Sequence, residues 1–424
     1  MKKYDKYKPT GSPWIGEIPE HWEVKRFRFV CNYKKGKNPK NLVFDFEDGM
    51  KPYLSMDYLR GTSNDVEYTF HEEGLVESKA GDLLLLWDGS NAGEFIISKD
   101  GYLSSTCALL SNKFESNSYF GYLCNVSEKY LKDMTNGMGI PHVDSNVFKN
   151  LTAIIPSQSE QESIVAYLDE KCGSVDMVIA KQERRIALLK ELKQSIISEA
   201  VTRGINPEAP LKATGIEWIG QIPEHWEVMP LKRTLSEPLM YGANESPDNV
   251  DESNPRYIRI TDIDENGKLK DDTFCTIDTK KAEPYMLSYG DILFARSGAT
   301  VGKTYIHLSE NPSCFAGYLI KATANDKTIL PLFLYYYTKS GLYISWKDSI
   351  NIQATIQNIG ADKYSTLPVI VPCIKEQKEI VDYIETKVNP IDQMIGKATR
   401  EIELLREYKQ IIITEAVTGK IKVC

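Results

Sequence analysis

The chain has 424 residues, of which 42% are hydrophobic and 26% charged, and its formal net charge of −8 argues against indiscriminate coating of nucleic acid. This composition is ordinary for a soluble globular protein of several domains, and no apolar run approaches the roughly 20 residues that a membrane helix needs. The N-terminus lacks the apolar core of a signal peptide, and the eight scattered cysteines, none in a C-x-x-C pair, favour reduced thiols in a cytoplasm over disulfides or a metal site.

A short aromatic segment opens each half of the chain. Residues 14–24 read WIGEIPEHWEV and residues 218–228 read WIGQIPEHWEV, and four of the six tryptophans lie in these two segments. A catalytic reading would rest on His21 and His225, but neither has a nucleophile or a metal-ligand cluster nearby in the sequence. We therefore interpret both copies as docking segments that hold on to the fold through aromatic side chains.

A basic stretch follows the first aromatic segment. Positions 25–44 contain no acidic residue and include Lys34, Lys35 and Lys37, interleaved with aromatic residues. This pattern suits a strand and loop that meet phosphate groups, and a solvated basic face is the equal alternative. The second half carries only two basic residues at the corresponding place. The two globular regions are therefore predicted to differ where they meet a partner.

Both globular regions are predicted to mix strands and helices. The segments 52–59 (PYLSMDYL) and 256–263 (RYIRITDI) have strand composition. Further along, 80–94 (AGDLLLLWDGSNAGE) and 289–303 (YGDILFARSGATVGK) each read as an apolar strand that enters a glycine turn. Each half then closes on a strand and a proline before its long helical stretch.

The second glycine turn nearly spells a phosphate-binding loop. Only three residues separate Gly298 from Gly302, whereas that loop needs four so that its amides curve round the phosphates. The first half has Glu94 in place of the lysine. We favour a glycine turn through which the backbone approaches another molecule. Arg296 and Lys303 would then reach outward, and arginine can read guanine or anchor to phosphate.

The long helical stretch occurs twice. The copies that start at Glu160 and Glu376 are offset by 216 residues without a gap, and 22 of their 43 positions are identical. A repeat of this length indicates a duplicated unit of domain plus helix. Gly173 in the first copy and Asn389-Pro390 in the second are expected to divide each stretch into a short helix and a long one.

Apolar residues recur along both long helices at steps of three and four. This spacing predicts a seam for packing helix on helix, and the simplest arrangement buries the two seams against each other. The alternative is an amphipathic helix packed on some other core. The seam positions that we single out are Ile179, Ile186, Leu189 and Ile196 in the first copy and Ile395, Ile402, Leu405 and Ile412 in the second.

These repeats resemble a known family. The W-I-G-x-I-P-E-H-W segment opens each half, and each half ends in I-P or V-P, then E-Q-x-x-I-V-x-Y and a helix closing in E-A-V-T. This order of motifs resembles the specificity subunit of type I restriction–modification systems over nearly the whole chain. The segment FARSGATVGK is also similar to a recurrent element of that family's target recognition domains.

The resemblance implies a mixed α/β fold with an internal pseudo-twofold repeat. Two target recognition domains would each read one half of a split site in double-stranded DNA, separated by two long helices paired as an antiparallel coiled coil. The implied partners are two methyltransferase subunits and the restriction (motor) subunits. Those partners would bind S-adenosylmethionine and ATP, and this chain would hold no cofactor and carry no catalysis.

The predicted regions follow from the repeats and the resemblance. Residues 1–156 form the first recognition domain with its aromatic segment, 157–204 the central helical region, 205–372 the second recognition domain, and 373–424 the C-terminal helical region. The residues predicted to bind DNA lie in the basic stretch, the strands and the glycine turns: Lys34, Lys35, Lys37, Trp87, Arg259, Arg296, Ser297 and Lys303.

Two other functions compete with this interpretation. A helical scaffold protein would share the long helices but would not bind DNA selectively. A nucleotide-binding protein would use the near-match to a phosphate-binding loop at 298–304.

Overall fold

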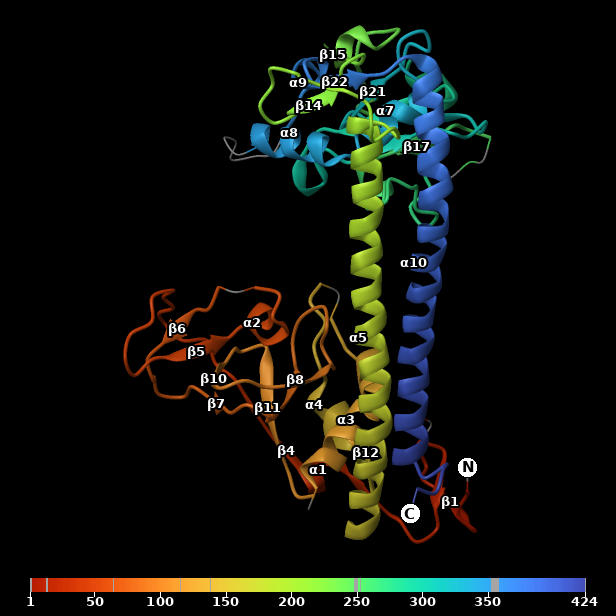
Figure 1. Cartoon of the computed structure of the whole chain (residues 1–424). Coiled ribbons are helices and arrows are strands. Elements are labelled where there is room, and N and C mark those ends of the chain that lie inside the picture. Colours follow the sequence, from red (N-terminus) through yellow and green to blue (C-terminus); the bar gives the residue numbers. More distant parts are fainter. Residues whose placement is uncertain are drawn as a thin grey trace. The chain divides into compact units, whose positions relative to one another are not determined.

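The computed structural model describes residues 2–423 except 13, 64, 115, 138, 248–250, 252 and 352–357. The chain divides into two compact units, unit 1 (Met1–Lys181 with Arg400–Cys424) and unit 2 (Gln182–Thr399). Each unit combines one globular part with a portion of both long helices, α5 (Gln158–Arg203) and α10 (Ile374–Val417) (Figure 1). The sequence-based division instead gave each helical stretch a region of its own.

The globular part of unit 1 is built from short strands and four helices. Its elements are β1 (Tyr7–Pro9), β2 (Glu17–Pro19), β3 (Glu23–Arg26), α1 (Phe27–Val30), β4 (Cys31–Lys35), β5 (Lys51–Leu54), α2 (Met56–Arg60), β6 (Tyr68–Thr69), β7 (Glu77–Ser78), β8 (Leu83–Leu86), β9 (Phe95–Ile97), β10 (Gly101–Leu103), β11 (Cys107–Asn112), α3 (Asn117–Asp133), α4 (Ser145–Asn150) and β12 (Thr152–Ile155). Two four-stranded sheets result, with orders β4-β11-β8-β9 and β6-β5-β10-β7, together with the pairs β1-β2 and β12-β3.

Unit 2 repeats this plan with a different sequence. Its elements are β13 (Leu211–Ala213), β14 (Gln221–Pro223), β15 (Glu227–Pro230), β16 (Met240–Tyr241), β17 (Arg256–Ile258), α6 (Thr279–Ala282), β18 (Ile292–Ala295), β19 (Thr304–Ile306), β20 (Ser313–Phe315), β21 (Leu319–Ala322), α7 (Pro331–Tyr337), α8 (Gly341–Asn351), α9 (Ala361–Ser365) and β22 (Pro368–Val371). The sheet β16-β21-β18-β19 has the order of β4-β11-β8-β9 in unit 1, and the parallel pair β17-β20 matches β5-β10. The predicted mixed fold and internal repeat are confirmed.

The prediction that each helical stretch breaks in two is wrong. Helix α5 runs through Gly173 and helix α10 runs through Pro390. A glycine inside a helix costs only about 1 kcal/mol and a proline about 3 kcal/mol, and buried apolar side chains continue on both sides of each residue. Cys172 and Val175 flank the glycine, as Val388 and Ile391 flank the proline, and all four are buried. Packing of the flanking turns therefore keeps each helix continuous.

The two long helices pack together within each unit, as predicted. In unit 1 the Lys409 Nζ lies 2.7 Å from the Asp176 Oδ1, and in unit 2 the Lys193 Nζ lies 2.6 Å from the Asp392 Oδ1. The two ion pairs are equivalent, because Lys193 and Lys409, like Asp176 and Asp392, are separated by the 216 residues of the repeat. The eight seam residues are all buried or partly buried, with Ile179, Ile402 and Ile412 among the buried ones. In each unit, one ion pair between α5 and α10 therefore accompanies the apolar contact between them.

Each aromatic segment fixes the start of one long helix beside the end of the other. In unit 1 the Trp22 indole N–H donates to the Glu160 Oε1 at 3.0 Å near the start of α5. A Cβ on Gly419, just past the end of α10, would lie 2.9 Å from the same ring. In unit 2 the Trp226 indole N–H donates to the Glu376 carboxylate near the start of α10 at 2.9 Å. A Cβ on Gly204, just past the end of α5, would lie 3.1 Å from the Trp226 ring. In both units the helices therefore run antiparallel.

The histidines of these segments have a structural role. The His21 Nε2 lies 2.9 Å from the Glu160 Oε1, and the His225 Nε2 lies 2.9 Å from the Glu376 Oε2. Each histidine thus shares the carboxylate that its neighbouring tryptophan also binds. This arrangement confirms that the repeated segment docks on the fold.

The Glu160 carboxylate predicts a pH-dependent stability for unit 1. Partial burial acts to raise its pKa, but the hydrogen bonds from Trp22, His21 and Ser157 outweigh this and lower the pKa to about 2, from 4.5. Because the folded-state pKa is lowered, the ionised carboxylate stabilises the fold above about pH 4.5, and this contribution disappears as the pH falls toward 2. We expect Glu160→Gln to reduce the free energy of unfolding at pH 7 and to match the parent protein near pH 2. Urea titrations across this range would measure the difference, and a constant difference would contradict it.

Candidate nucleic-acid interface

In each globular part the predicted glycine turn connects the two strands of a tight hairpin, β8 and β9 in unit 1 and β18 and β19 in unit 2. The Gly93 amide donates to the Leu86 carbonyl at 2.8 Å in unit 1, and Gly302 donates to Ala295 at 2.9 Å in unit 2. Both glycines have positive φ, of 93° and 81°, which a residue with a Cβ rarely adopts. The turn in unit 2 leads into β19, which pairs antiparallel with β18. A phosphate-binding loop leads into a helix instead, so the topology excludes the nucleotide-binding alternative.

A cation and an aromatic ring face each other beside this hairpin in both units. In unit 1 the Lys35 Nζ lies 5.4 Å from the centre of the Trp87 ring. In unit 2 the Arg296 guanidinium carbon lies 4.8 Å from the centre of the Tyr241 ring. Lys35 and Tyr241 are equivalent because each lies opposite the same position of the central strand, β11 or β21. Trp87 and Arg296 are also equivalent, because each directly follows the strand before the turn. The cation therefore lies at the first of these two positions in unit 1 and at the second in unit 2, and the aromatic ring lies at the other.

The unit 2 side of this pair is open. Tyr241 is partly exposed and Tyr318, whose carbonyl accepts from the Arg296 amide at 3.0 Å, is 62% exposed. The Arg296 Nε is buried and has no hydrogen-bond partner among the described residues, and an unpaired donor of this kind costs about 1–3 kcal/mol. Ser297 lies next to it, bridged to Asn358. In unit 2 the Arg296 guanidinium therefore lies over the Tyr241 ring, and the exposed residue Tyr318 borders Arg296 through its backbone.

The corresponding surface of unit 1 is closed. Trp87 is only 6% exposed and packs against Tyr33, with ring centres 4.4 Å apart, and against Phe148. These neighbours cover its ring, which weighs against the predicted contact of Trp87 with DNA. The Lys35 Nζ is held at 2.9 Å from the Asp88 Oδ2. The cation of unit 1 is therefore partly neutralised, whereas Ser297 replaces the aspartate in unit 2.

The other predicted cations lie at different places. Lys34 is exposed on the edge strand β4 and forms no ion pair with any described residue. Lys37 is exposed and donates to the Glu73 carbonyl at 3.0 Å. In unit 2 the Lys303 Nζ, at the end of the turn, lies 3.9 Å from the Glu265 carboxylate. These three lysines stay predicted DNA contacts.

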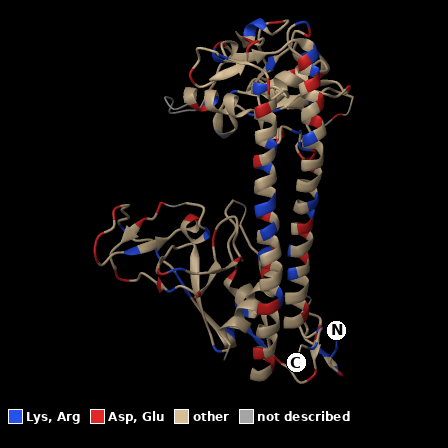
Figure 2. Ribbon diagram, in the orientation of Figure 1, with Lys and Arg blue, Asp and Glu red and all other residues tan. Residues whose placement is uncertain are grey.

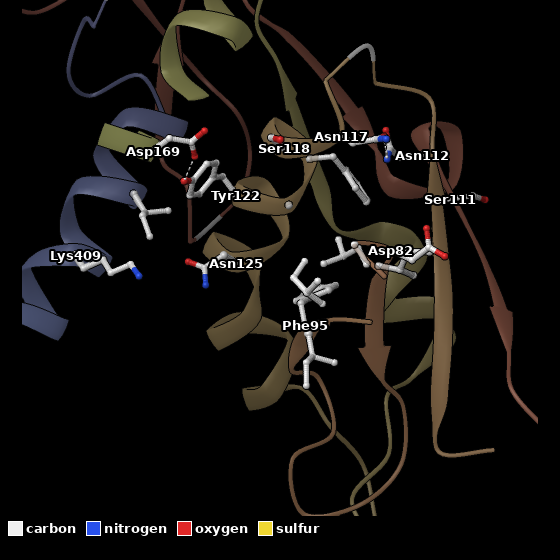
Figure 3. Close-up of a pocket in the computed structure, with 18 residues that line it drawn as sticks. Asp82, Phe95, Ser111, Asn112, Asn117, Ser118, Tyr122, Asn125, Asp169 and Lys409 are labelled. Atoms are coloured by element: carbon white, nitrogen blue, oxygen red, sulfur yellow. Dashed lines mark hydrogen bonds between the residues drawn. The ribbon is translucent and has the colours of Figure 1, made fainter. Parts of the chain in front are cut away.

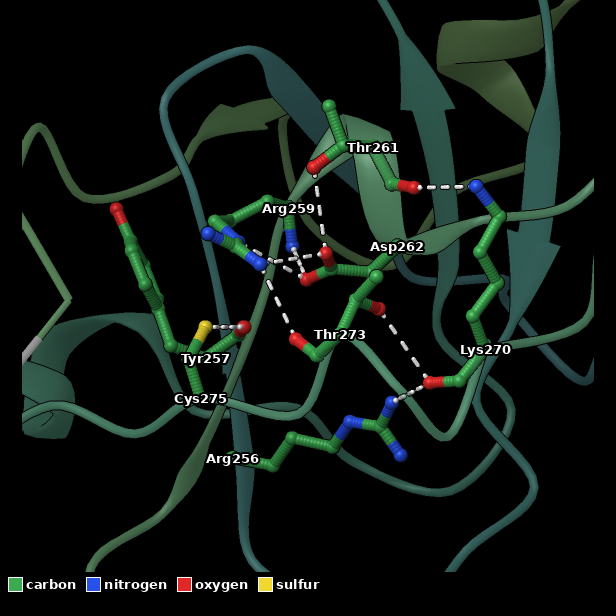
Figure 4. A network of polar contacts seen from close by, with 8 residues as sticks. All are labelled: Arg256, Tyr257, Arg259, Thr261, Asp262, Lys270, Thr273 and Cys275. Atoms are coloured by element: carbon green, nitrogen blue, oxygen red, sulfur yellow. Dashed lines mark hydrogen bonds and ion pairs between the residues drawn. The ribbon is translucent and has the colours of Figure 1, made fainter. Parts of the chain in front are cut away.

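Arg259 belongs to a structural network (Figure 4). Its Nη2 donates to the Asp262 Oδ1 at 2.9 Å and to the Thr273 carbonyl at 3.1 Å, and its Nε donates to the Asp262 Oδ2 at 3.2 Å. Asp262 is buried, and its hydrogen bonds raise the pKa of the Arg259 guanidinium above its ordinary value. The side chain joins segment 259–262 to segment 270–275. Its donors are largely committed to the fold, which weighs against its predicted contact with DNA.

Sequence reasoning missed Tyr241 and Tyr318. Tyrosines are common in this chain, and only the sheet register reveals that these two border Arg296. The signal that could have pointed to Tyr318 is its place in the segment FAGYL, which links β20 to β21.

Exposed apolar residues form a second feature on the long helices. We define the docking patch of unit 1 as Val178, Leu404 and Tyr408, and the docking patch of unit 2 as Met394, Leu188 and Leu192. All six side chains are between 39% and 50% exposed, and the 216-residue repeat relates each member of one patch to a member of the other. Basic and acidic residues are interspersed around them along both helices (Figure 2). Exposed apolar residues that recur in both units are candidates for contact with a protein partner.

The described residues offer neither a metal-binding cluster nor a membrane-spanning helix. No group of three or more histidine, cysteine, aspartate or glutamate side chains is arranged to hold a metal ion. No helix there is both long enough and apolar enough to span a membrane.

The comparison with known families decides the identity. The family model described as "Type I restriction modification DNA specificity domain" matches residues 19–175 and 243–404. The chain belongs to this family. Each match covers most of the globular part of one unit and continues into a long helix, so the two globular parts are the target recognition domains of a specificity subunit.

Individual relatives agree with this assignment. The chain is 29% identical over 416 residues to the MjaVIII specificity subunit of Methanocaldococcus jannaschii, covering 96% of this chain and 94% of the relative. It is 22% identical to the EcoBI specificity subunit of Escherichia coli, covering 95% and 87%. A solved chain, from a study of complex assembly and conformational transition of the type I R-M system, matches with a TM-score of 0.63 at 16% identity, covering 95% and 99%. This last similarity supports the fold alone. Specificity subunits are DNA-recognition components without catalytic activity, which agrees with the prediction of a non-enzymatic chain.

Proposed function

We propose that this specificity subunit recognises a split site in double-stranded DNA, with each target recognition domain reading one half. The observation that carries this proposal is the exchanged cation–aromatic pair. The same two sheet positions hold Lys35 and Trp87 in one domain and Tyr241 and Arg296 in the other. Domains that share a fold but differ at one surface are expected to read different sequences, because base readout depends on the side chains presented there.

We further propose that the two docking patches each bind one methyltransferase subunit. Two related patches support two copies, since a repeated surface offers the same contacts twice. Restriction (motor) subunits would join through this assembly, S-adenosylmethionine and ATP would bind to the partner subunits, and the complex would act in the cytoplasm. The free thiols of all seven described cysteines fit a reducing compartment.

Methylome sequencing of cells that express this chain with its methyltransferase tests the recognition proposal. We expect one split motif in the parent strain. Arg296→Ala should relax only the half read by the second domain, because a base-reading arginine contributes about 1–3 kcal/mol. Lys327→Ala is a suitable control, since it removes an exposed lysine of the same domain just before α7, outside the hairpin, and should leave the motif unaltered. A uniform loss at all sites would mark Arg296 as a phosphate contact, and an unchanged motif would remove it from the interface.

A further inference from the structure

Unit 1 contains a groove of about 720 Å³ beside its target recognition domain (Figure 3). One wall is formed by the edge strand β9, its neighbour β8 and the end of β11, and the other is helix α3. Asp169 of α5 and Lys409 of α10 lie at one end. The Tyr122 hydroxyl donates to the Asp169 Oδ1 at 2.7 Å across this end.

The internal repeat identifies the corresponding space in unit 2. Sheet register makes Thr304 equivalent to Phe95, because both lie opposite the same residue of the preceding strand. Along the helices, Tyr122 contacts Asp169, and Tyr336 lies beside Glu385, which is the repeat of Asp169. This alignment places Tyr335 of unit 2 where unit 1 has Gly121, and Lys339 where unit 1 has Asn125.

A turn of the chain fills that space in unit 2. The turn, residues 264–268, is centred on Gly267, where a Cβ would lie 2.6 Å from both the Thr304 carbonyl oxygen and the Tyr335 hydroxyl. The Tyr335 hydroxyl donates to the Asn266 carbonyl at 3.4 Å, and the Lys339 Nζ donates to the Thr304 carbonyl at 2.9 Å. Only a glycine fits this closely against both side chains. The second strand of the hairpin is consequently covered in unit 2.

Among the described residues of unit 1, no such turn covers the groove. The second hairpin strand ends in Ile97, which is 58% exposed, whereas the equivalent Ile306 is 7% exposed. A Cβ on Gly121 would meet no atom within 4 Å. The Asn125 Oδ1 is buried and has no hydrogen-bond partner among the described residues. The groove therefore has the volume for a turn and an acceptor that needs a donor.

The carboxylates that line the groove indicate which kind of ligand it can bind. Asp82 and Asp169 both line it, while the Lys409 ammonium is bound to Asp176 at 2.7 Å. Two carboxylates repel the phosphates of DNA and favour a donor or a cation. Unit 2 shows the opposite arrangement, in which the basic residues Lys303 and Lys339 receive the acidic turn.

We infer that this groove binds a turn of the methyltransferase subunit that contains a glycine and carries a lysine or arginine. The inference rests on the proposed docking of that subunit, and the groove reaches the same stretch of α10 as the docking patch, since Lys409 lines the groove and Tyr408 belongs to the patch. Among the described residues the groove is open in unit 1 and the corresponding space in unit 2 is filled, so one of the two methyltransferase copies makes this contact.

Filling the groove tests the inference. Gly121→Tyr supplies the side chain that unit 2 carries, at a position where an added Cβ meets no atom within 4 Å, and Gly121→Ala is the matched control that leaves the groove open. Both changes favour the helix, since glycine is a poor helix former. We expect titration calorimetry and native mass spectrometry to show two methyltransferase copies on the parent chain and on Gly121→Ala. On Gly121→Tyr one copy should bind about tenfold more weakly, with the other unchanged.

Asn125→Ala provides a second variant if Gly121→Tyr does not fold, with the same expected direction. Unchanged affinity for both copies on the folded variants would overturn the inference while leaving the proposed function intact. Absence of methyltransferase binding to the parent chain would overturn both. A photo-crosslinker at Ser118 in the DNA-bound complex should label a lysine- or arginine-bearing segment of the methyltransferase, and labelling of DNA instead would show that the groove serves a different ligand.

Discussion

Trp226→Ala is expected to destabilise unit 2 by about 3–5 kcal/mol, the usual cost of removing a large buried aromatic side chain. Its ring is fully buried, and its N–H is one of two donors that bind Glu376 at the start of α10. The substitution leaves a cavity and removes a hydrogen bond at the place where the two long helices meet the recognition domain. A loss of this size is a large part of the stability of a typical domain, about 5–15 kcal/mol.

The same aromatic segment provides the control for this experiment. Trp218 is 37% exposed, so Trp218→Ala should change the free energy of unfolding by less than about 1 kcal/mol. Urea denaturation followed by circular dichroism would compare both variants with the parent chain. Trp226→Phe should fall between them, because it keeps most of the apolar volume and loses the donor. Similar stabilities for the two alanine variants would show that the segment does not anchor the helix.

Placing charges in one docking patch is expected to remove one methyltransferase copy. Leu404→Glu with Tyr408→Glu introduces two carboxylates into the patch of unit 1, and burying them against an apolar partner surface would cost several kcal/mol. The partner should therefore bind at least about a hundredfold more weakly at unit 1. Methylation by the complex should fall with it.

The repeat supplies the complementary variant. Leu188→Glu with Leu192→Glu should remove the copy at unit 2, and the four substitutions together should abolish binding. Leu404→Ile with Tyr408→Phe keeps the patch apolar and should bind both copies. Native mass spectrometry would count the bound subunits. Two copies on either glutamate variant would place the docking surface elsewhere on the chain.

The long-range organisation could be predicted because it is written as repetition. The aromatic segments, the helix copies and the glycine turns all recur in the same order, so the fold and its symmetry follow from comparing the chain with itself. The continuous helices at Gly173 and Pro390 could not be predicted from local propensity. Burial of the flanking turns, which depends on the other helix, outweighs the local cost at both residues.

The candidate interface was only partly accessible from the sequence. Arg296 and its turn could be recognised because a strand, a glycine and a cation lie close together in the chain. The pairing of Arg296 with Tyr241, and of Lys35 with Trp87, depends on which residues the sheet places opposite one another. The same limit explains why Trp87 looked available to DNA: the rings that cover it come from residues far away in the sequence.

The composition of unit 1 from both ends of the chain has a consequence for synthesis on the ribosome. Unit 2 is a single contiguous stretch and can fold as soon as it has emerged, whereas unit 1 needs residues from Arg400 onward. The Lys422 amide donates to the Lys2 carbonyl at 2.8 Å, so Lys2 cannot form this hydrogen bond until Lys422 has been synthesised. At about 5–20 residues per second, the nascent N-terminal half stays incomplete for roughly ten to forty seconds. During that time the core of unit 1 lacks Ile413, Ala416 and Val417, and a product truncated before Arg400 would never gain them.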